Sequence, residues 1–238
     1  MEILFDLHTH TLASGHAYST IRENVAEAKN KGLLAYGFSD HAEKMPGSTG
    51  NLYFVNFAAI PDYIDGVRVY CGVEANIMDY DGTLDINKRV ESKVDYIIAS
   101  MHMPCIAINQ DIETVTRGLV NVMQNPKVKI IGHPDDSRYP CDYDIVVREA
   151  VRTNTILELN NSSLGPRSTR ENPYENMKEM LAKCIKYGAK VIINSDAHYC
   201  GEVGEVSNIL TLLEEVNFPE ELVINTSLEG LKLVINEK

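Results

Sequence analysis

The sequence predicts an α/β fold built around a parallel β-sheet. Seven apolar runs of 5 to 9 residues, rich in Val, Ile and Leu, alternate with amphipathic stretches, and successive runs begin 27 to 34 residues apart. Continuous apolar runs of this length are typical of strands covered on both faces, and the long connections between them suit parallel crossovers. The chain has 238 residues and 44% hydrophobic content, which fits one α/β barrel. We therefore expect a single domain over residues 1–238.

The predicted strands cover residues 3–10, 33–40, 67–75, 94–100, 128–132, 155–159 and 189–195. The amphipathic stretches predict helices over residues 20–31, 111–124, 143–152, 174–187 and 203–216. The first helix has clear ends, because Thr20 and Glu23 form a capping-box pattern and Gly32 follows the last turn. Residues 222–226 form one more apolar run before a final helix from Leu228, and whether this run is an eighth strand stays open.

The sequence argues against a membrane-spanning protein, a secreted protein and a protein that binds nucleic acid. No apolar run approaches the roughly 20 residues that a membrane span needs, and the first ten residues leave no room for a signal peptide. The five cysteines are odd in number and form no C-x-x-C spacing, which suits free thiols in the cytoplasm. The formal net charge of −12 disfavours nucleic acid and acidic membranes, because phosphate groups attract basic faces.

All seven histidines fall at or just after the ends of predicted strands. They are His8 and His10 at the first strand, His16 in the loop that follows, His41 at the second, His102 at the fourth, His133 at the fifth and His198 at the seventh. Parallel barrels build their sites from the carboxyl ends of strands and the loops after them. We therefore expect all seven imidazoles on one face. Residues 43–56, the longest loop-like stretch, also follow a strand and are a candidate lid over that face.

Two carboxylates end strands on the same face, Glu74 at the third and Asp196 at the seventh. Taken singly, each of these nine residues is more simply a hydrogen-bonded strand-end histidine or a helix-capping acid. Together they would be poorly solvated and mutually repelling, whereas divalent ions would satisfy all of them. Imidazole with carboxylate and no thiolate suits Zn, Mn, Fe or Ni, and zinc is our first choice. Nine ligands with one shared carboxylate are enough for three ions.

Four motifs resemble those of the polymerase and histidinol phosphatase (PHP) superfamily. In chain order they are His8-Thr9-His10-Thr11, Ser39-Asp40-His41, Gly132-His133-Pro134-Asp135 and Ser195-Asp196-Ala197-His198. The match spans the first to the seventh predicted strand. The compact length and the segment Leu159-Asn160-Asn161-Ser162-Ser163 look most like the stand-alone YcdX-type phosphatases.

The resemblance implies a distorted (β/α)7 barrel, similar to a TIM barrel, with a trinuclear metal site at the carboxyl ends of the strands. Carried over by position, His8, His10, Glu74 and Asp196 would hold one ion. Glu74, as a bridge, would hold the second with His102 and His133. His16, His41 and His198 would hold the third. We expect these ions to be zinc, with Mn or Fe as alternatives.

Hydrolysis of phosphate monoesters is the function that the ligand set favours. The sequence contains no P-loop, no G-x-S-x-G elbow and no Cys-centred phosphatase loop. His8, His10, Glu74 and Asp196 would be catalytic through a metal-activated water. We expect a small phosphorylated substrate, and its identity, the general acid and the oligomeric state stay open.

Further residues near the motifs have expected supporting roles. Arg167 and Arg170, after the sixth predicted strand, are candidates for binding the substrate phosphate, because arginine offers a planar fork of donors. The alternative for each is a solvated loop cation. Asp40 and Asp135 neighbour ligand histidines, and we expect them to orient those histidines or to cap strands rather than to serve as the general acid.

Two other functions are compatible with the same motifs. One is a phosphodiesterase or nuclease acting on nucleic acid, which the acidic composition disfavours. The other is a non-catalytic, metal-dependent binding module, which the intact ligand set disfavours.

Overall fold

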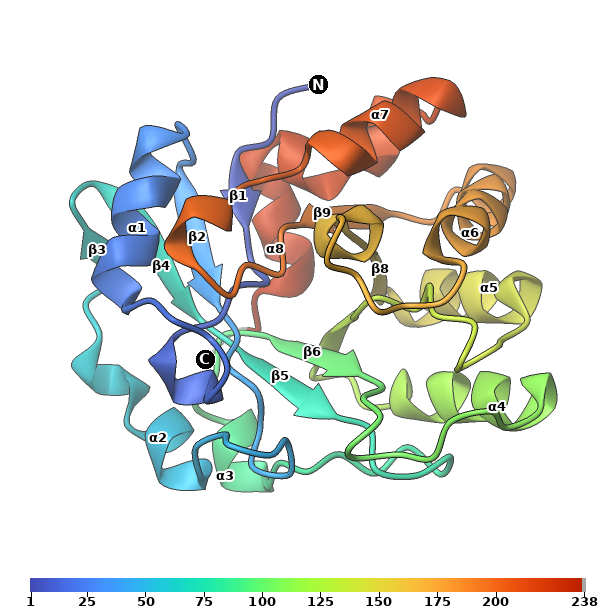
Figure 1. The fold of residues 1–238 in the computed structure, drawn as a ribbon, viewed down its shortest axis with the longest axis horizontal. Coiled ribbons are helices and arrows are strands. Elements are labelled where there is room, and N and C mark those ends of the chain that lie inside the picture. Colours follow the sequence, from blue (N-terminus) through green and yellow to red (C-terminus); the bar gives the residue numbers. More distant parts are fainter. Residues whose placement is uncertain (237–238) are drawn as a thin grey trace.

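The computed structural model describes residues 1–236 and shows two β-sheets with helices around them (Figure 1). One sheet has the strand order β1-β2-β4-β3 and the other β5-β6-β7-β8-β9. The strands are β1 (Phe5–Asp6), β2 (Ala35–Phe38), β3 (Tyr63–Ile64), β4 (Val67–Cys71), β5 (Val73–Asn76), β6 (Ile97–Ser100), β7 (Val128–Ile131), β8 (Ile156–Asn160) and β9 (Val191–Asn194). Every neighbouring pair is parallel except β3 and β4. The predicted α/β fold with a parallel sheet is confirmed.

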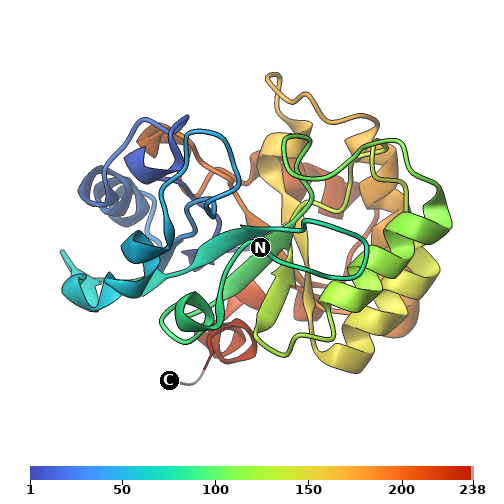
Figure 2. The same ribbon diagram turned by 90° about the horizontal axis from the view of Figure 1, so that it is seen from below.

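Each predicted helix is present. The helices are α1 (Ile21–Asn30), α2 (Asn51–Val55), α3 (Lys88–Glu91), α4 (Ile112–Val122), α5 (Tyr143–Thr153), α6 (Pro173–Tyr187), α7 (Ser207–Glu215) and α8 (Leu231–Val234). The capping box of α1 is confirmed, since Thr20 and Glu23 exchange backbone and side-chain hydrogen bonds. Helix α7 begins later than predicted because Gly204, with φ +69°, turns the chain. Figures 1 and 2 show α4, α5 and α6 side by side along the five-stranded sheet.

The predicted strand over residues 67–75 is two strands in different sheets, which corrects the sequence interpretation. Strand β4 ends at Cys71 and β5 begins at Val73. A Cβ atom at Gly72 would lie 2.3 Å from the Tyr96 ring, so only glycine fits between them. Its amide donates to the Phe38 carbonyl at 2.9 Å. Because glycine has no side chain, the backbone can pass close to Tyr96 here, where the chain leaves one sheet and enters the other.

Strand β1 is shorter than the predicted residues 3–10, because side chains take over its backbone hydrogen bonds. The amide of Leu7 donates to Oδ1 of Asn194 at 3.0 Å, and that of His8 donates to Oδ1 of Asp6 at 3.2 Å. The histidine pair therefore lies just beyond a two-residue strand.

The two sheets meet where their strands end. Thr9 pairs with Ala197 and His41 pairs with Glu74, each through a single parallel bridge. The amide of Asp196 also donates to the carbonyl of His8 at 2.8 Å. These contacts bring the carboxyl ends of β1, β2 and β9 beside the start of β5, where Glu74 is the second residue rather than the last one.

The structure also settles two segments: residues 222–226, for which an eighth strand was left open, and residues 43–56, which looked like a loop. Residues 222–226 lie in 3-10 turns, and Val223 makes one bridge to Val191, so this run is not an eighth strand. The stretch 43–56 ends in helix α2.

Buried side chains form two apolar clusters. The smaller one takes residues from six strands, namely Phe5, Ala35, Ile98, Ile130, Ile156 and Ile192, together with Tyr96. The larger cluster packs the helices onto the strands. Among residues 1–236, no helix has both the length and the apolar character needed to cross a bilayer.

Candidate metal centre

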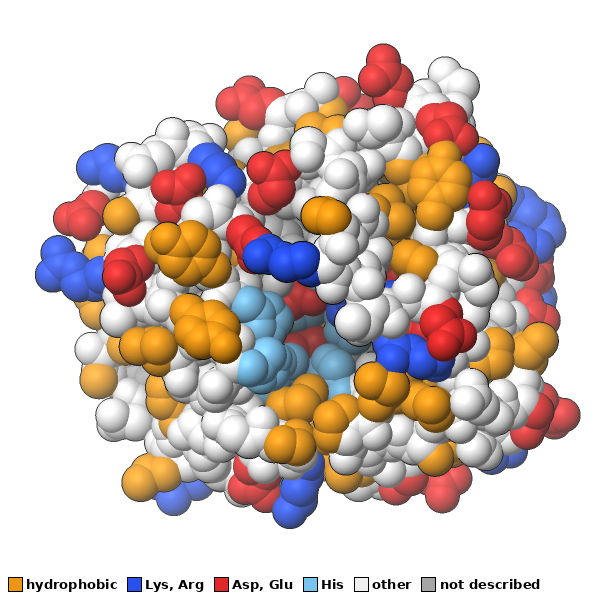
Figure 3. All heavy atoms as spheres, in the orientation of Figure 1, with side chains coloured by type: hydrophobic (Ala, Val, Ile, Leu, Met, Phe, Trp, Pro, Cys, Tyr) orange, Lys and Arg blue, Asp and Glu red, His pale blue; other side chains and the backbone are white. Residues whose placement is uncertain are grey.

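The structure brings all seven histidines together with Glu74 and Asp196. In Figure 3 histidine side chains surround acidic groups in a hollow on the surface. Contacts and ring pairs join them into one continuous group: His8, His10, His16, His41, His102, His133 and His198. The gathering expected from the strand ends is therefore observed.

Glu74 lies at the centre of this group and is fully buried. Its Oε1 lies 3.3, 3.3 and 3.1 Å from the Nε2 atoms of His8, His102 and His133, respectively. Its Oε2 lies 3.5 Å from Nε2 of His10 and 2.6 Å from Nδ1 of His41. One carboxylate thus faces five imidazoles.

Asp196 faces the same group from the end of β9. Its Oδ1 lies 3.2 Å from Nε2 of His10, 3.5 Å from Nε2 of His8 and 3.6 Å from Nδ1 of His198. The φ angle of Asp196 is +55°, a conformation that costs free energy outside glycine. His133 also has a positive φ, of 31°. Backbone strain therefore occurs at two of the nine candidate ligands.

His16, His41 and His198 form the outer part of the group. The ring centroid of His16 lies 5.0 Å from that of His41 and 4.7 Å from that of His198. His16 is exposed and the His198 side chain is 28% exposed, whereas His41 is buried. This part of the site is open to solvent.

Neighbouring side chains hydrogen-bond to Nδ1 of His102 and of His10, so that Nε2 of each ring can face the centre. Nδ1 of His102 lies 2.8 Å from Oδ1 of Asn76. Nδ1 of His10 lies 3.0 Å from Oγ of Ser14, and Ser14 in turn donates to Asp40 at 2.6 Å. Because Ser14 donates to the carboxylate, its oxygen accepts from His10, which leaves Nε2 of His10 for another partner. Asp40 thus acts through Ser14 on His10, rather than on its neighbour in the chain, His41.

Glu158 is the principal residue that the sequence interpretation missed. It lies in the middle of β8, is fully buried, and has Oε1 2.7 Å from Nδ1 of His8. The available signal was a lone acid inside the apolar run at residues 155–159. Asn76, at the end of β5, was missed as well.

The charges of the cluster shift its pKa values strongly. Burial favours a neutral carboxyl, but His8, His102 and His41 outweigh it and hold the pKa of Glu74 well below its usual range. Burial likewise lowers the pKa of His8, but Glu158, Glu74 and Asp196 outweigh it and raise that pKa well above its usual value. A proton on His8 therefore balances the acids when no cation is bound, and a cation would compete with it.

The donor set fits divalent ions. Among the candidate ligands in residues 1–236, four buried atoms make no hydrogen bond: Nε2 of His8, Nε2 of His10, Nδ1 of His41 and Oε2 of Glu74. Three sets of side chains have ligand atoms within 4.8 Å of one another: His8, His10 and Glu74; His41, Glu74 and His102; His10, His41 and His198. Buried, unpartnered nitrogen and oxygen atoms at this spacing suit zinc and related ions.

The two candidate arginines occupy different places. The Arg170 side chain is 16% exposed, and its Nη2 lies 3.3 Å from Oδ2 of Asp196. Its Nη1 donates to Ser163 at 2.9 Å. Arg167 is 80% exposed and pairs with Glu202. Arg170 therefore lies at the centre, and Arg167 lies on the surface.

Other residues near the motifs are tied to the surrounding loops. Ser162 donates to Oδ2 of Asp196 at 3.2 Å, whereas Asn161 accepts from the amides of Asn208 and Ile209 and so holds the start of α7. Asp135 is buried with Oδ1 3.9 Å from Nε of Arg170. Burial raises the pKa of Asp135 to about 6, although Arg170 opposes this.

The stretch 43–56 packs beside the centre. Tyr53 donates to Asp40 at 2.7 Å, and Ser48 donates to the carbonyl of His41 at 3.0 Å. A Cβ atom at Gly15 would lie 2.2 Å from the carbonyl oxygen of Gly47, so this stretch closely contacts the loop that carries His16.

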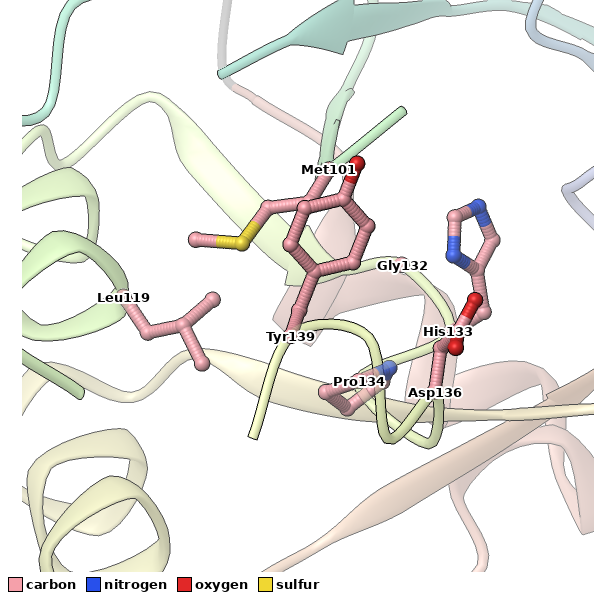
Figure 4. A pocket seen from close by; sticks show the side chains of 7 residues that line it. All are labelled: Met101, Leu119, Gly132, His133, Pro134, Asp136 and Tyr139. Atoms are coloured by element: carbon pink, nitrogen blue, oxygen red, sulfur yellow. The ribbon is translucent and has the colours of Figure 1, made fainter. Parts of the chain in front are cut away.

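A small pocket adjoins the centre on the side of His133 (Figure 4). Its walls include Met101, Leu119 and Tyr139, and His133 and Asp136 lie at one end. Because its walls are mainly apolar, this pocket neighbours the candidate metal centre rather than forming part of it.

Comparisons with known proteins agree with the site. The model of the PHP domain matches residues 6–164. A protein named probable phosphatase from Caldanaerobacter subterraneus subsp. tengcongensis is 43% identical over 239 residues, which cover 100% of this chain and 93% of the relative. A probable phosphatase from Clostridium acetobutylicum is 42% identical over 226 residues, covering 95% of this chain and 91% of the relative.

Two solved structures share the fold at low identity. Histidinol phosphate phosphatase from Lactococcus lactis subsp. lactis, crystallised with Zn, L-histidinol and phosphate, is 18% identical with a TM-score of 0.59, covering 90% of this chain and 94% of that chain. A chain in the cryo-EM structure of archaeal ribonuclease P with mature tRNA is 15% identical with a TM-score of 0.60, covering 96% of this chain and 90% of that chain. At these identities the likeness concerns the fold.

Proposed function

The chain belongs to the PHP domain family, and on that premise we propose that it is a metal-dependent phosphatase that hydrolyses phosphate monoesters. The observation that carries the proposal is the convergence of six imidazoles on Glu74 and Asp196, with His16 beside them and four buried ligand atoms that make no hydrogen bond. Relatives about as long as this chain are named probable phosphatases, which supports the reaction class.

Three ions are proposed, with Glu74 shared between two of them. His8, His10, Glu74 and Asp196 would hold the first, and the 3.2 to 3.5 Å contacts between these histidines and these carboxylates support this grouping. Glu74, His102 and His133 hold the second. The ring contacts of His16 with His41 and His198 support a third, outer ion. Zinc is the first choice, because the Lactococcus lactis phosphatase was crystallised with Zn, and Mn or Fe are the alternatives.

The chain's own residues hold and orient the reacting groups. When bound, the ions supply an activated water and the positive charge that a phosphate ester needs for attack. Glu74 and Asp196 would help to hold the ions, and His8, His10, Glu74 and Asp196 are the residues proposed to act in catalysis through them. No residue is assigned as general acid.

Arg170 is the proposed contact for a substrate phosphate oxygen. It lies within 3.3 Å of Asp196 and is backed by Ser163, so its fork of donors faces the centre. Arg167 stays a weaker candidate, because its pairing with Glu202 occupies the guanidinium. The substrate proposed is a small phosphorylated molecule.

We also infer that the parallel strands form a distorted seven-stranded barrel in one domain over residues 1–238, with β4 and β5 counted as one strand. The apolar cluster shared by six strands supports this, as do the bridges Thr9–Ala197 and His41–Glu74 between the sheets. A cytoplasmic location is proposed because none of the five cysteines, all of which lie within residues 1–236, forms a disulfide.

The experiment compares two substrates after metal removal and zinc return. Nitrophenyl phosphate, a monoester, should be hydrolysed by the zinc-loaded protein and not by the metal-free protein or by His8→Ala. Preference for bis(nitrophenyl) phosphate would instead favour a phosphodiesterase. Absence of hydrolysis of both esters by folded, metal-loaded protein would favour a non-catalytic binding module.

A further inference from the structure

Glu158 joins two candidate ligands that belong to different proposed ions. Its Oε1 lies 2.7 Å from Nδ1 of His8, and its Oε2 accepts from the backbone amide of His133 at 2.8 Å. Both contacts are fully buried. Among residues 1–236, Glu158 is thus the carboxylate that contacts both Nδ1 of His8 and the backbone amide of His133.

All four hydrogen-bonding positions of this carboxylate are taken. Asn194 donates to Oε1 at 2.8 Å, and Asn160 donates to Oε2 at 3.1 Å. A carboxylate has about four lone-pair sites, and His8, His133 and the two asparagines fill them. Glu158 is therefore held rigidly and has no oxygen left for direct metal binding.

The contact to His133 supports a strained backbone. His133 has a φ of 31°, a region that non-glycine residues avoid. A charge-assisted hydrogen bond to its amide offsets part of the strain and fixes the direction of the imidazole. The contact to His8 places the hydrogen on Nδ1, which leaves Nε2 to face Glu74 and Asp196.

We propose that Glu158 is a positioning residue that couples the two inner metal sites, one oxygen orienting His8 and the other orienting His133. This inference rests on the proposed function, because it takes these histidines as ligands. Glu74 is a second link between the two sites, since the Nε2 atoms of His8 and His133 both contact its Oε1. Movement of either imidazole therefore disturbs both inner ions.

The decisive substitution is Glu158→Gln, which keeps size and shape. An amide has one accepting oxygen, so its NH2 group must face either the N–H of His8 or that of His133, whichever way it turns. Loss of a group that orients a metal-ligating histidine typically weakens metal binding about 10- to 100-fold. We expect a weakening of this size for two of the three ions.

The experiment titrates zinc into metal-free protein in competition with a fluorescent zinc chelator. His16→Ala is the comparison for losing the outer ion alone. Tyr96→Phe is the matched control, because it removes a buried hydrogen bond to the carbonyl of Leu7 and touches no candidate ligand. Circular dichroism of each metal-free variant checks folding, and Glu158→Asp carries the test if Glu158→Gln does not fold.

The expected result is weaker binding of two ions in Glu158→Gln, of one in His16→Ala and of none in Tyr96→Phe. Zinc binding by Glu158→Gln equal to that of the parent would overturn the inference, as would equal weakening in Tyr96→Phe. A parent protein that binds no zinc would instead contradict the proposed function, so the two failures are distinguishable.

Discussion

Nδ1 of His41 lies 2.6 Å from Oε2 of Glu74, at a point where the two sheets meet. The same two residues form the single parallel bridge between the segment after β2 and strand β5. Glu74 is thus fixed by backbone pairing and surrounded by imidazoles. A carboxylate held in place before ions bind is suited to bridging them, because little reorganisation is needed.

Substitution of Glu74 by Gln should remove the bridge between the inner ions. We expect kcat with nitrophenyl phosphate to fall about 100-fold or more, because the ions supply several kcal/mol and each 1.4 kcal/mol is tenfold. Metal analysis should show fewer bound ions. Glu229→Gln, at an exposed position paired with Lys232, is the control. Unchanged kcat and metal content in Glu74→Gln would rule out the bridging role.

Arg170→Ala should weaken binding of phosphate. A hydrogen bond to a charged group contributes about 1.5 to 3 kcal/mol, so the inhibition constant of inorganic phosphate should rise about 10-fold or more. Arg167→Ala should have little effect, because Arg167 is exposed and pairs with Glu202. The two variants are compared by inhibition of nitrophenyl phosphate hydrolysis, and a larger effect in Arg167→Ala would reverse their proposed roles.

Much of the site was predictable because its chemistry depends on strand ends. A histidine or acid that follows an apolar run must lie at the end of a strand, and parallel strands bring those ends together. This logic placed His8, His133 and Asp196 near one another despite their separation in the chain. The capping box at Thr20 was predictable for a different reason, because capping is a local interaction between residues three apart.

The missed features depend on contacts between distant residues. Glu158 looked like an isolated acid in a strand. Its partner His133 follows the neighbouring strand β7, and its partner His8 follows β1 of the other sheet, so the folded chain is needed to recognise both. The break at Gly72 depends on the ring of Tyr96, 24 residues later. Arg167 and Arg170 are three residues apart, and only the folded loop shows that Arg170 is the one near Asp196.

Thr20→Ala should lower stability without changing catalysis. Loss of an N-cap side chain costs about 1 kcal/mol, which lowers Tm by roughly 2–4 °C in a chain of this size. The capping box lies at the start of α1, and the side chain of Thr20 hydrogen-bonds to Glu23 rather than to a candidate ligand. Thermal unfolding and kcat are measured on the same variant. A fall in kcat of the folded variant would contradict the prediction that Thr20 contributes to stability and not to catalysis.

Acidification should lower the free energy of unfolding of the metal-free protein, and part of this effect should come from His16. Burial, His41 and His198 lower the pKa of His16 from 6.5 to about 4. Between these values the unfolded chain binds a proton that the folded protein does not, so the free energy of unfolding decreases as pH falls through this window.

His16→Gln removes this contribution and should make stability less dependent on pH between about 6.5 and 4. Urea unfolding of parent and variant with a chelator present provides the comparison. Identical pH dependence in the two proteins would show that His16 does not titrate in this way.

Zinc titration of metal-free protein, with bound zinc and nitrophenyl phosphate hydrolysis measured in the same samples, tests the central claim most directly. The account predicts no hydrolysis without metal, and activity that rises with bound zinc and reaches its maximum at about three ions per chain. Full activity in a metal-depleted sample would contradict it.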